Sequence, residues 1–214
     1  MNVGAGSGSY EPRELLVVAV EPSAVMVAQR PQDRACAVRA SAGRLPIQDR
    51  GVDAAMAVLT IHHWDEELDA GLSELLRVAR EAILIVTYDP MVSSRMWLVN
   101  DYLPEVGDLD LATFPDIGWL VDRLGGDVEV ETVFTARDTP DWTFGSFWAH
   151  PERVLDEVAR NATSGFARMD TAVVRRVVND VKRDLEDGSW DRRHGHLRSA
   201  TEYDAGMRLV VARL

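Results

Sequence analysis

The chain begins with three closely spaced glycines, Gly4, Gly6 and Gly8, which are followed by an apolar run at residues 16–20 and then by Glu21. Glycines permit the sharp turn, and the close approach of backbone to a ligand, that occur where the first strand of an α/β sheet ends. A carboxylate at the end of the next strand can accept hydrogen bonds from both hydroxyls of a ribose. This order of features predicts the nucleoside-binding edge of a parallel sheet, and it constrains the fold more than any other part of the chain.

The spacing of the glycines bears on the kind of nucleotide that such an edge would bind. The dinucleotide fingerprint G-x-G-x-x-G requires its third glycine at the position of Ser9, whereas the chain has Gly8 instead. Pro12 leaves little room for a helix after the loop, because proline is not tolerated in a helix interior. We therefore expect a short turn there, which would weaken the helix dipole that a pyrophosphate needs. An NAD-dependent oxidoreductase is the less favoured alternative.

Length, charge and cysteine content limit the class of protein. The chain has 214 residues with 46% hydrophobic content, which is enough for one substantial core, so we expect a single domain over residues 1–214. A net charge of −12 argues against a nucleic-acid partner. The single cysteine, Cys36, excludes an internal disulfide and a cysteine-based zinc site. With no apolar run approaching the roughly 18 residues of a membrane span, we expect a cytoplasmic protein without membrane partners and leave its oligomeric state open.

Strand and helix signals alternate over the first two thirds of the chain, as in a mostly parallel sheet covered by helices. Four short apolar runs predict buried strands, at residues 16–20, 37–39, 54–61 and 82–87. Cys36 enters the second of these runs between two alanines, so we expect it to be buried. Apolar residues recur at helical spacing over residues 66–80 and again over 170–186, where Asp170 is the expected N-cap and Gly188 the terminator. An alternating pattern at residues 128–134 predicts a half-exposed strand.

Four ordered segments resemble the class I S-adenosylmethionine-dependent methyltransferases, and the resemblance covers residues 1–90. The segments are the glycine loop at residues 2–10, the family's second motif at 17–23, its adenine loop at 40–46, and its fourth strand with the following loop at 52–64. The resemblance implies a Rossmann-like sheet with helices on both faces and with residues 207–212 as an antiparallel edge strand. It also implies a cofactor-binding half at 1–90, substrate-covering and helical elements at 91–206, a final strand at 207–214, and S-adenosylmethionine-dependent methyl transfer to a small-molecule acceptor.

The resemblance implies cofactor-binding residues in these same segments. They are Gly4, Ala5, Gly6, Gly8, Tyr10, Glu21, Pro22, Ser23, Ser41, Ala42, Leu59 and Thr60. The glycines would line the methionine part of the cofactor, with Gly6 as the point of closest backbone approach, and Glu21 would bind the ribose. Ser41 stands where the family often carries an aspartate that binds adenine, and the backbone of Ala42 could address the ring nitrogens.

Catalytic residues are harder to identify, because methyl transfer depends mainly on holding donor and acceptor in a near-attack geometry. A general base is needed only if the acceptor must lose a proton. His63 is a candidate base, and the alternatives for it are cofactor orientation or loop packing. Neighbouring residues that leave a strand point in opposite directions, so at most one of His62 and His63 should face the pocket. His194 and His196 have no nearby cysteine and form a poor zinc pattern, so we expect no metal.

Two further features leave alternatives open. Only residues 1–3 precede the glycine loop, where the family has a longer first strand, so we expect a truncated strand and reduced stability and cofactor affinity. This feature and the serine at position 41 motivate a second alternative, a non-catalytic or degenerate cofactor-binding domain. Four aromatic residues could either wall an apolar acceptor pocket or belong to the core. They are Trp97, Tyr102, Trp142 and Trp148.

Overall fold

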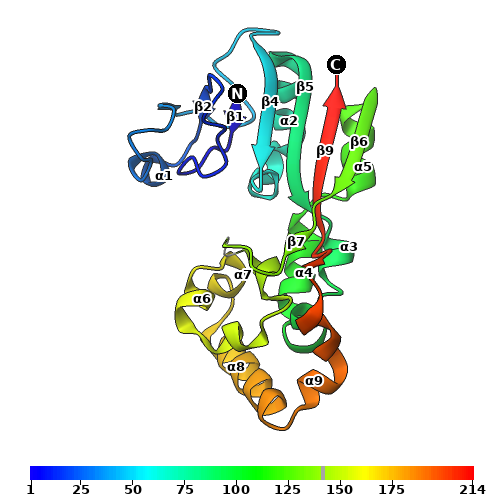
Figure 1. Ribbon diagram of the computed structural model, residues 1–214. Helices are drawn as coiled ribbons and strands as arrows, with labels where there is room; N and C mark the ends of the chain where they lie inside the picture. Colours follow the sequence, from blue (N-terminus) through cyan, green and yellow to red (C-terminus); the bar gives the residue numbers. More distant parts are fainter. Residues whose placement is uncertain (141–142) are drawn as a thin grey trace. The chain divides into compact units, whose positions relative to one another are not determined.

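The computed structural model describes residues 1–140 and 143–214, so Trp142 lies outside the described residues. These residues form two compact units. Unit 1 comprises Met1–Tyr88, Thr113–Glu131 and Arg208–Leu214, and unit 2 comprises Asp89–Ala112 and Thr132–Met207. The ribbon and the labels used below are shown in Figure 1. The organisation as one domain stays a prediction.

Unit 1 is built on a seven-stranded sheet with the order β3-β2-β1-β4-β5-β9-β6. The strands are β1 (Asn2–Val3), β2 (Ala19–Val20), β3 (Ala37–Val38), β4 (Val52–Val58), β5 (Ala79–Tyr88), β6 (Asp127–Thr132) and β9 (Met207–Arg213). Strands β1 to β5 pair in parallel. Although β1 has only two residues, Asn2 pairs with Ala19 of β2 on one side and with Met56 of β4 on the other. The predicted α/β sheet is confirmed, and its short first strand still joins the two neighbouring strands.

The last strand runs antiparallel, as expected. The amide of Leu214 donates to the carbonyl of Glu81, and the amide of Asp89 donates to that of Gly206, so β9 runs opposite to β5. The expected edge position, however, is wrong. Strand β9 lies between β5 and β6, and β6 takes the edge. The exposed side chains of β6 suit an edge, whereas β9 carries the buried Val210 and Ala212.

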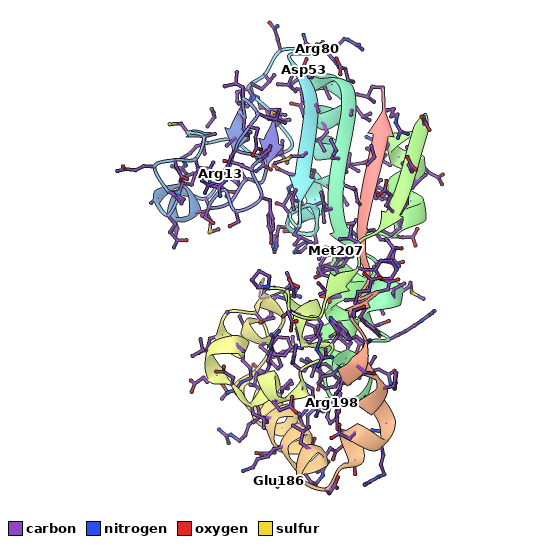
Figure 2. All side chains as sticks on the ribbon, in the orientation of Figure 1. Arg13, Asp53, Arg80, Glu186, Arg198 and Met207 are labelled. Carbon is purple, nitrogen blue, oxygen red and sulfur yellow. The ribbon has the colours of Figure 1, made fainter. Side chains whose placement is uncertain are left out.

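The core of unit 1 lies between the sheet and two helices, α2 (Leu68–Val78) and α5 (Ile117–Leu124). Over residues 54–58 of β4 and 82–88 of β5 every second residue is buried, while the residues between are only partly covered, because successive side chains of a strand point to opposite faces. Arg123 of α5 donates to Asp69 of α2 and joins the two helices. Near the amino-terminal ends of β4 and β5, Asp53 and Arg80 form an ion pair that links the two strands (Figure 2).

Several predicted boundaries were wrong for local reasons. The strand predicted at residues 16–20 is confined to Ala19–Val20, and Leu16 is fully exposed. The strand predicted at 54–61 ends at Val58, because Leu59 adopts a φ of +51° and the chain then forms a 3-10 turn. Cys36 lies before β3 and is exposed rather than buried. No helix follows the glycine loop in the described residues, as predicted, and the first α-helix is α1 (Ala24–Ala28), after β2.

Unit 2 is mainly helical. Its α-helices are α3 (Pro90–Ser93), α4 (Pro104–Thr113), α6 (Glu157–Asn161), α7 (Ser164–Ala167), α8 (Thr171–Glu186) and α9 (Ser189–His194), beside a two-stranded sheet of β7 (Thr135–Ala136) and β8 (Glu202–Tyr203). Helix α8 confirms the prediction from capping, with Asp170 at the N-cap and Gly188 in the left-handed region after it. Trp97, Tyr102 and Trp148 are buried in the core of this unit, which confirms the packing interpretation for these three.

The histidines of the rejected zinc pattern lie on this unit. His194 approaches Asp101 at 2.7 Å, and its ring lies beside Trp97 and Trp190. No group of three side chains that could hold a metal comes together within the described residues. Nor does any helix of that part of the chain have the length and apolar character needed to cross a bilayer.

Candidate functional site

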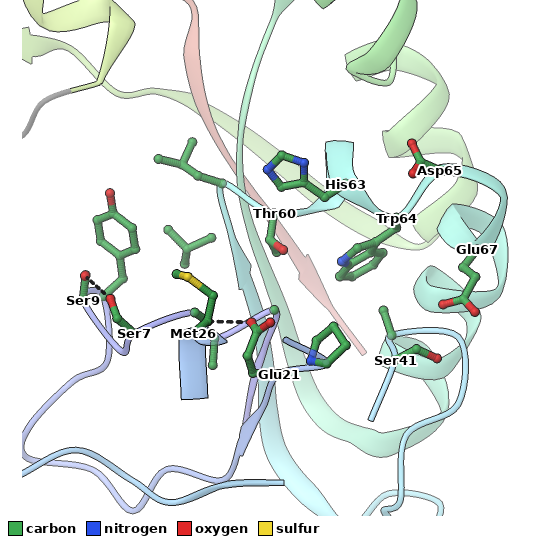
Figure 3. A pocket seen from close by; sticks show the side chains of 18 of the residues that line it. Ser7, Ser9, Glu21, Met26, Ser41, Thr60, His63, Trp64, Asp65 and Glu67 are labelled. Atoms are coloured by element: carbon green, nitrogen blue, oxygen red, sulfur yellow. Dashed lines mark hydrogen bonds between the residues drawn. The ribbon is translucent and has the colours of Figure 1, made fainter. Parts of the chain in front are cut away.

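Unit 1 contains a cavity of about 1110 Å³ at the carboxyl ends of its parallel strands. Its walls come from the glycine loop, the end of β2, the segment after β3, the end of β4 and the turn before α2 (Figure 3). Open α/β sheets bind their ligands at this edge. Small-molecule sites typically measure about 300–1,000 Å³, so this cavity has room for a ligand of nucleoside size and for a further group beside it.

Most of the predicted site residues line this cavity. They are Gly4, Ala5, Gly6, Tyr10, Glu21, Pro22, Ser41, Ala42, Leu59, Thr60 and His63. Gly8 and Ser23 are not part of the lining and instead support it. A Cβ on Gly8 would lie 3.2 Å from Glu11, Arg30 and Arg34, and Ser23 caps α1 by accepting from the amide of Met26 at 3.3 Å.

The two glycines in the cavity wall have different roles. Gly4 has a φ of +69°, and a Cβ there would lie 2.1 Å from Oγ1 of Thr60, so Gly4 allows Thr60 to pack directly on the loop. Gly6 has a φ of +51°, and its Cβ would meet only the end of the Met26 side chain, at 3.3 Å. Gly6 therefore leaves the loop backbone open, as close approach to a ligand requires.

Glu21 connects the end of β2 to the glycine loop. Its Oε2 accepts from the amide of Gly6 and its Oε1 from the amide of Ser23, both at 2.8 Å. Only 7% of the residue is exposed. Figure 3 shows the carboxylate at the cavity wall, with Met26 beside it. Since each carboxylate oxygen has two acceptor sites, Glu21 can still accept hydrogen bonds from a diol ligand.

The aromatic side chain of Trp64 forms part of the cavity wall beside Ala42. Trp64 lines the cavity and is 8% exposed. It packs on α2 at Gly71, where a Cβ would lie 2.6 Å from the indole ring and 3.2 Å from the Cβ of Ala42. Gly71 thus gives Trp64 the space to pack against the helix, next to the loop that was predicted to hold adenine.

A carboxylate on α2 holds the segment that continues from that loop. Glu74 accepts from the amide of Leu45 at 2.6 Å and from Arg77 at 2.6 and 2.8 Å. Arg77 in turn donates to the carbonyls of Leu45 and Ile47. The hydrogen bond from Arg77 lowers the pKa of Glu74 below its ordinary value. Residues 45–47 are therefore fixed to α2 by charge-assisted hydrogen bonds.

The two histidines after β4 lie in different surroundings. His63 is exposed and lines the cavity, whereas the ring of His62 stacks on Phe114 with 4.2 Å between centroids. Only His63 of the two lines the cavity, although their rings contact each other with 3.9 Å between centroids. Strand alternation was the predicted reason, but the two residues belong to a 3-10 turn at Ile61–His63. The turn follows Leu59, whose positive φ is rare for a non-glycine residue and re-aims the chain at the cavity.

The charges on the described part of the cavity lining are all negative. Four carboxylate residues, Glu21, Asp65, Glu66 and Glu67, belong to it, and none of the described lining residues is Lys or Arg. A pyrophosphate at this site would face carboxylates without a compensating cation and without a helix N-terminus at the glycine loop. The electrostatics therefore favour a ligand with a diol and a positive charge over a dinucleotide.

Several lining residues were not predicted. They are Ser7, Ser9, Met26, Val58, Trp64 and the acidic run Asp65–Glu67. Trp64 could have been found from its position directly after the two histidines that follow the fourth strand. Met26 gives no such signal, since it reaches the cavity only through the packing of α1 beside the glycine loop.

The sequence model of the methyltransferase domain family matches residues 1–86. Among curated protein sequences, none matches this chain. Among solved structures, a protein from Anabaena variabilis described as a candidate methyltransferase from an antibiotic biosynthesis pathway is 29% identical, with a TM-score of 0.91 over 100% of this chain and 89% of that one.

Two more distant structures share the fold. One is an S-adenosylmethionine-dependent methyltransferase from Archaeoglobus fulgidus, 14% identical, with a TM-score of 0.53 over 100% of this chain and 84% of that one. The other is a phosphoethanolamine N-methyltransferase 2 from Haemonchus contortus in complex with S-adenosylhomocysteine, 15% identical, with a TM-score of 0.54 over 98% of this chain and 46% of that one.

The match to the methyltransferase domain family indicates S-adenosylmethionine as the cofactor. The cavity fits such a cofactor, because Gly6 leaves the loop backbone open, Glu21 offers carboxylate oxygens, and no Lys or Arg among the described lining residues would repel the sulfonium. Residues 1–86 therefore match the methyltransferase domain family, and the sheet has the fold of the class I S-adenosylmethionine-dependent methyltransferases.

Proposed function

We propose that this chain is an active enzyme of the cytoplasm that transfers a methyl group from S-adenosylmethionine to a small-molecule acceptor. The observation that carries the proposal is the cavity at the carboxyl edge of the sheet, where Glu21 is bonded to the backbone of the glycine loop. This arrangement supports the proposal, because a carboxylate that could accept from a diol lies next to the backbone of Gly6, which is open to close approach.

Each part of the lining then has a role in holding the cofactor. Glu21 would accept from the ribose hydroxyls, and the backbone at Gly4–Gly6 would hold the amino-acid part. Trp64 and the backbone of Ala42 would contact the adenine. When bound, the cofactor supplies a methyl group on a positively charged sulfur, which is open to displacement by a nucleophile.

The protein's own contribution is to bind and orient the two reactants. Holding them in a near-attack geometry can supply roughly 7–11 kcal/mol. If the acceptor atom carries a proton that must leave, His63 is the cavity residue suited to receive it near neutral pH. An acceptor that already has a lone pair needs no such base.

Two observations support a small molecule as the acceptor. The net charge of −12 and the acidic lining disfavour nucleic acid, and none of the described lining residues could bind phosphate through a guanidinium or ammonium group. The relative from an antibiotic biosynthesis pathway aligns with the whole chain. Small molecules from such pathways are therefore the first acceptors to screen.

Calorimetric titration of the purified chain with S-adenosylhomocysteine tests the proposal, with NADH as the comparison ligand and a thermal melt to show folding. We expect micromolar binding of S-adenosylhomocysteine alone, followed by its formation from S-adenosylmethionine when a suitable acceptor is added. A folded chain that binds neither ligand would refute the proposal. A chain that binds the cofactor but turns over with no acceptor in a broad screen would support the alternative of a non-catalytic binding domain.

A further inference from the structure

The glycine loop of this chain lacks the support of a following helix. After β1 the chain passes through residues 4–18 without forming an α-helix. A helix there would pair successive backbone groups and hold the end of the loop. Instead the carbonyls of Ala5 and Gly6 face the side chain of Arg30, which follows α1.

Arg30 is held in a fully bonded position behind the loop. Its Nη1 donates to the carbonyls of Gly6 at 2.9 Å and Ala5 at 3.5 Å, and its Nη2 donates to Oε1 of Glu11 at 2.6 Å. Both Nε and Nη2 donate to the carbonyl of Ala35, at 3.0 and 2.7 Å. All five N–H donors of the guanidinium are therefore used.

This cluster is buried. The side chains of Arg30 and Glu11 are only 5% and 2% exposed. The planar guanidinium presents its N–H donors in a fixed, forked arrangement, so it orients its partners as well as supplying a charge. The ammonium of a lysine at the same position could not reproduce this orientation. Neither Arg30 nor Glu11 lines the cavity, so any effect on a ligand must pass through the loop.

Gly6 is held from both sides as a result. Its amide donates to Glu21, which lines the cavity, and its carbonyl accepts from Arg30 behind the loop. Fixing both groups sets the orientation of the two peptide units on either side of the Gly6 Cα, and so the way the loop backbone faces the cavity. By fixing Gly6, Arg30 therefore also sets the position of the Gly6 amide, which is the hydrogen-bond donor to the Glu21 carboxylate.

We propose that Arg30 is a positioning residue for the cofactor, which replaces the missing helix by holding the carbonyls of Ala5 and Gly6 and so orders the glycine loop before the ligand arrives. The proposal rests on the cofactor function proposed above. The competing explanation is that Arg30 serves stability alone, by neutralising the buried carboxylate of Glu11, since removing one partner of a buried ion pair is strongly destabilising.

The double variant Arg30→Met/Glu11→Met separates the two explanations. It removes the fork without leaving a buried charge, and replacing a buried ion pair by apolar side chains is often neutral for stability. We expect its melting temperature to be close to that of the wild type, its affinity for S-adenosylhomocysteine to fall about tenfold, and hydrogen exchange at residues 4–11 to become faster in the absence of ligand. Wild-type affinity together with wild-type exchange in a folded double variant would overturn the proposal.

Two single variants complete the test. Arg30→Lys keeps a cation near Glu11 but loses the fork, so it should also weaken binding and accelerate exchange in the loop, which keeps the proposal testable if the double variant does not fold. Arg34→Met is the matched control, because Arg34 donates to the carbonyl of Glu11 at 3.0 Å and to none of the three carbonyls that Arg30 holds. A loss of affinity in Arg34→Met equal to that in Arg30→Lys would overturn the specific role of Arg30.

The exchange measurement also separates failure of this inference from failure of the proposed function. It is made on the free protein and needs no cofactor. A wild type that does not bind S-adenosylhomocysteine would refute the function, while unchanged exchange in the Arg30 variants would refute the ordering of the loop by Arg30.

Discussion

Replacing Glu21 by alanine should weaken both the fold and the binding of the cofactor. The carboxylate accepts from the amides of Gly6 and Ser23 and is 7% exposed, so both amides lose a charged partner in the variant. Hydrogen bonds to charged groups contribute about 1.5–3 kcal/mol each. Both bonds are only partly buried, so water can replace part of each, and we expect a loss of about 2–4 kcal/mol in the free energy of unfolding.

For a chain of this length, 1 kcal/mol shifts the melting temperature by about 2–4 °C, so the variant should melt about 5–15 °C below the wild type. Calorimetry well below that temperature should then show an affinity for S-adenosylhomocysteine reduced by roughly tenfold or more, since the loss of charge-assisted bonds to the ribose of about 1.5 kcal/mol corresponds to a factor of ten. Glu21→Gln keeps one acceptor oxygen, but its NH₂ group would face one of the two backbone amide donors. We therefore expect Glu21→Gln to lose most of the affinity for S-adenosylhomocysteine that Glu21→Ala loses.

Glu14→Ala, at an exposed position outside the cavity, is the control and should change neither quantity. A Glu21→Ala protein with the melting temperature of the wild type would show that the two amide bonds do not stabilise the fold. A folded variant with wild-type affinity would show that Glu21 does not bind the cofactor, and the inference that its carboxylate accepts from the ribose diol would be wrong.

Three further perturbations test other parts of the site. Gly4→Ala should unfold at a lower temperature than Gly6→Ala in a thermal melt, because its Cβ would lie 2.1 Å from Thr60 while that of Gly6 meets only a flexible methionine at 3.3 Å; equal melting temperatures would contradict this ranking. His62→Ala should lower stability by about 0.5–1.5 kcal/mol through the lost ring contact, whereas His63→Ala should leave cofactor affinity intact and reduce turnover of a protonated acceptor; a large loss of affinity in His63→Ala would make it a cofactor ligand instead. Glu74→Gln should destabilise the protein at neutral pH. Because the hydrogen bond from Arg77 lowers the pKa of Glu74, the difference in melting temperature between wild type and variant should shrink as the pH falls below the ordinary pKa of 4.5. A difference independent of pH would show that the charge of Glu74 does not contribute to stability.

The order of the sequence motifs was enough to predict where the cavity would form. In a parallel sheet every strand delivers the residue after its last position to the same edge, so the glycine loop, Glu21, Ser41 and Thr60 had to meet once their strands were identified. The structure brings these residues together around one cavity. The same reasoning correctly excluded a helix directly after the glycine loop, because the constraint from Pro12 is local.

Predictions that depended on the ends of strands were less accurate. Hydrophobicity continues through Leu59 and Ile61, but the chain leaves the sheet at Val58, because the positive φ of Leu59 is a conformation that the pattern of apolar residues does not encode. Residues 16–18 are apolar too and stay outside β2, where Leu16 is fully exposed. Apolar character predicts burial on average, whereas pairing requires a partner strand at the right register.

What the sequence determined by itself is the class of fold and the residue types that meet at the carboxyl edge of its sheet, because strand periodicity, glycine spacing and the acid after the second strand are local properties of the chain. Only the tertiary structure decided that β9 lies inside the sheet rather than at its edge, that Trp64 and Met26 join the cavity wall, and that Arg30 supports the glycine loop. Each of these depends on contacts between segments distant in the sequence. Such contacts are selected by the burial of apolar surface and the pairing of buried polar groups in the folded chain, and no local pattern records them.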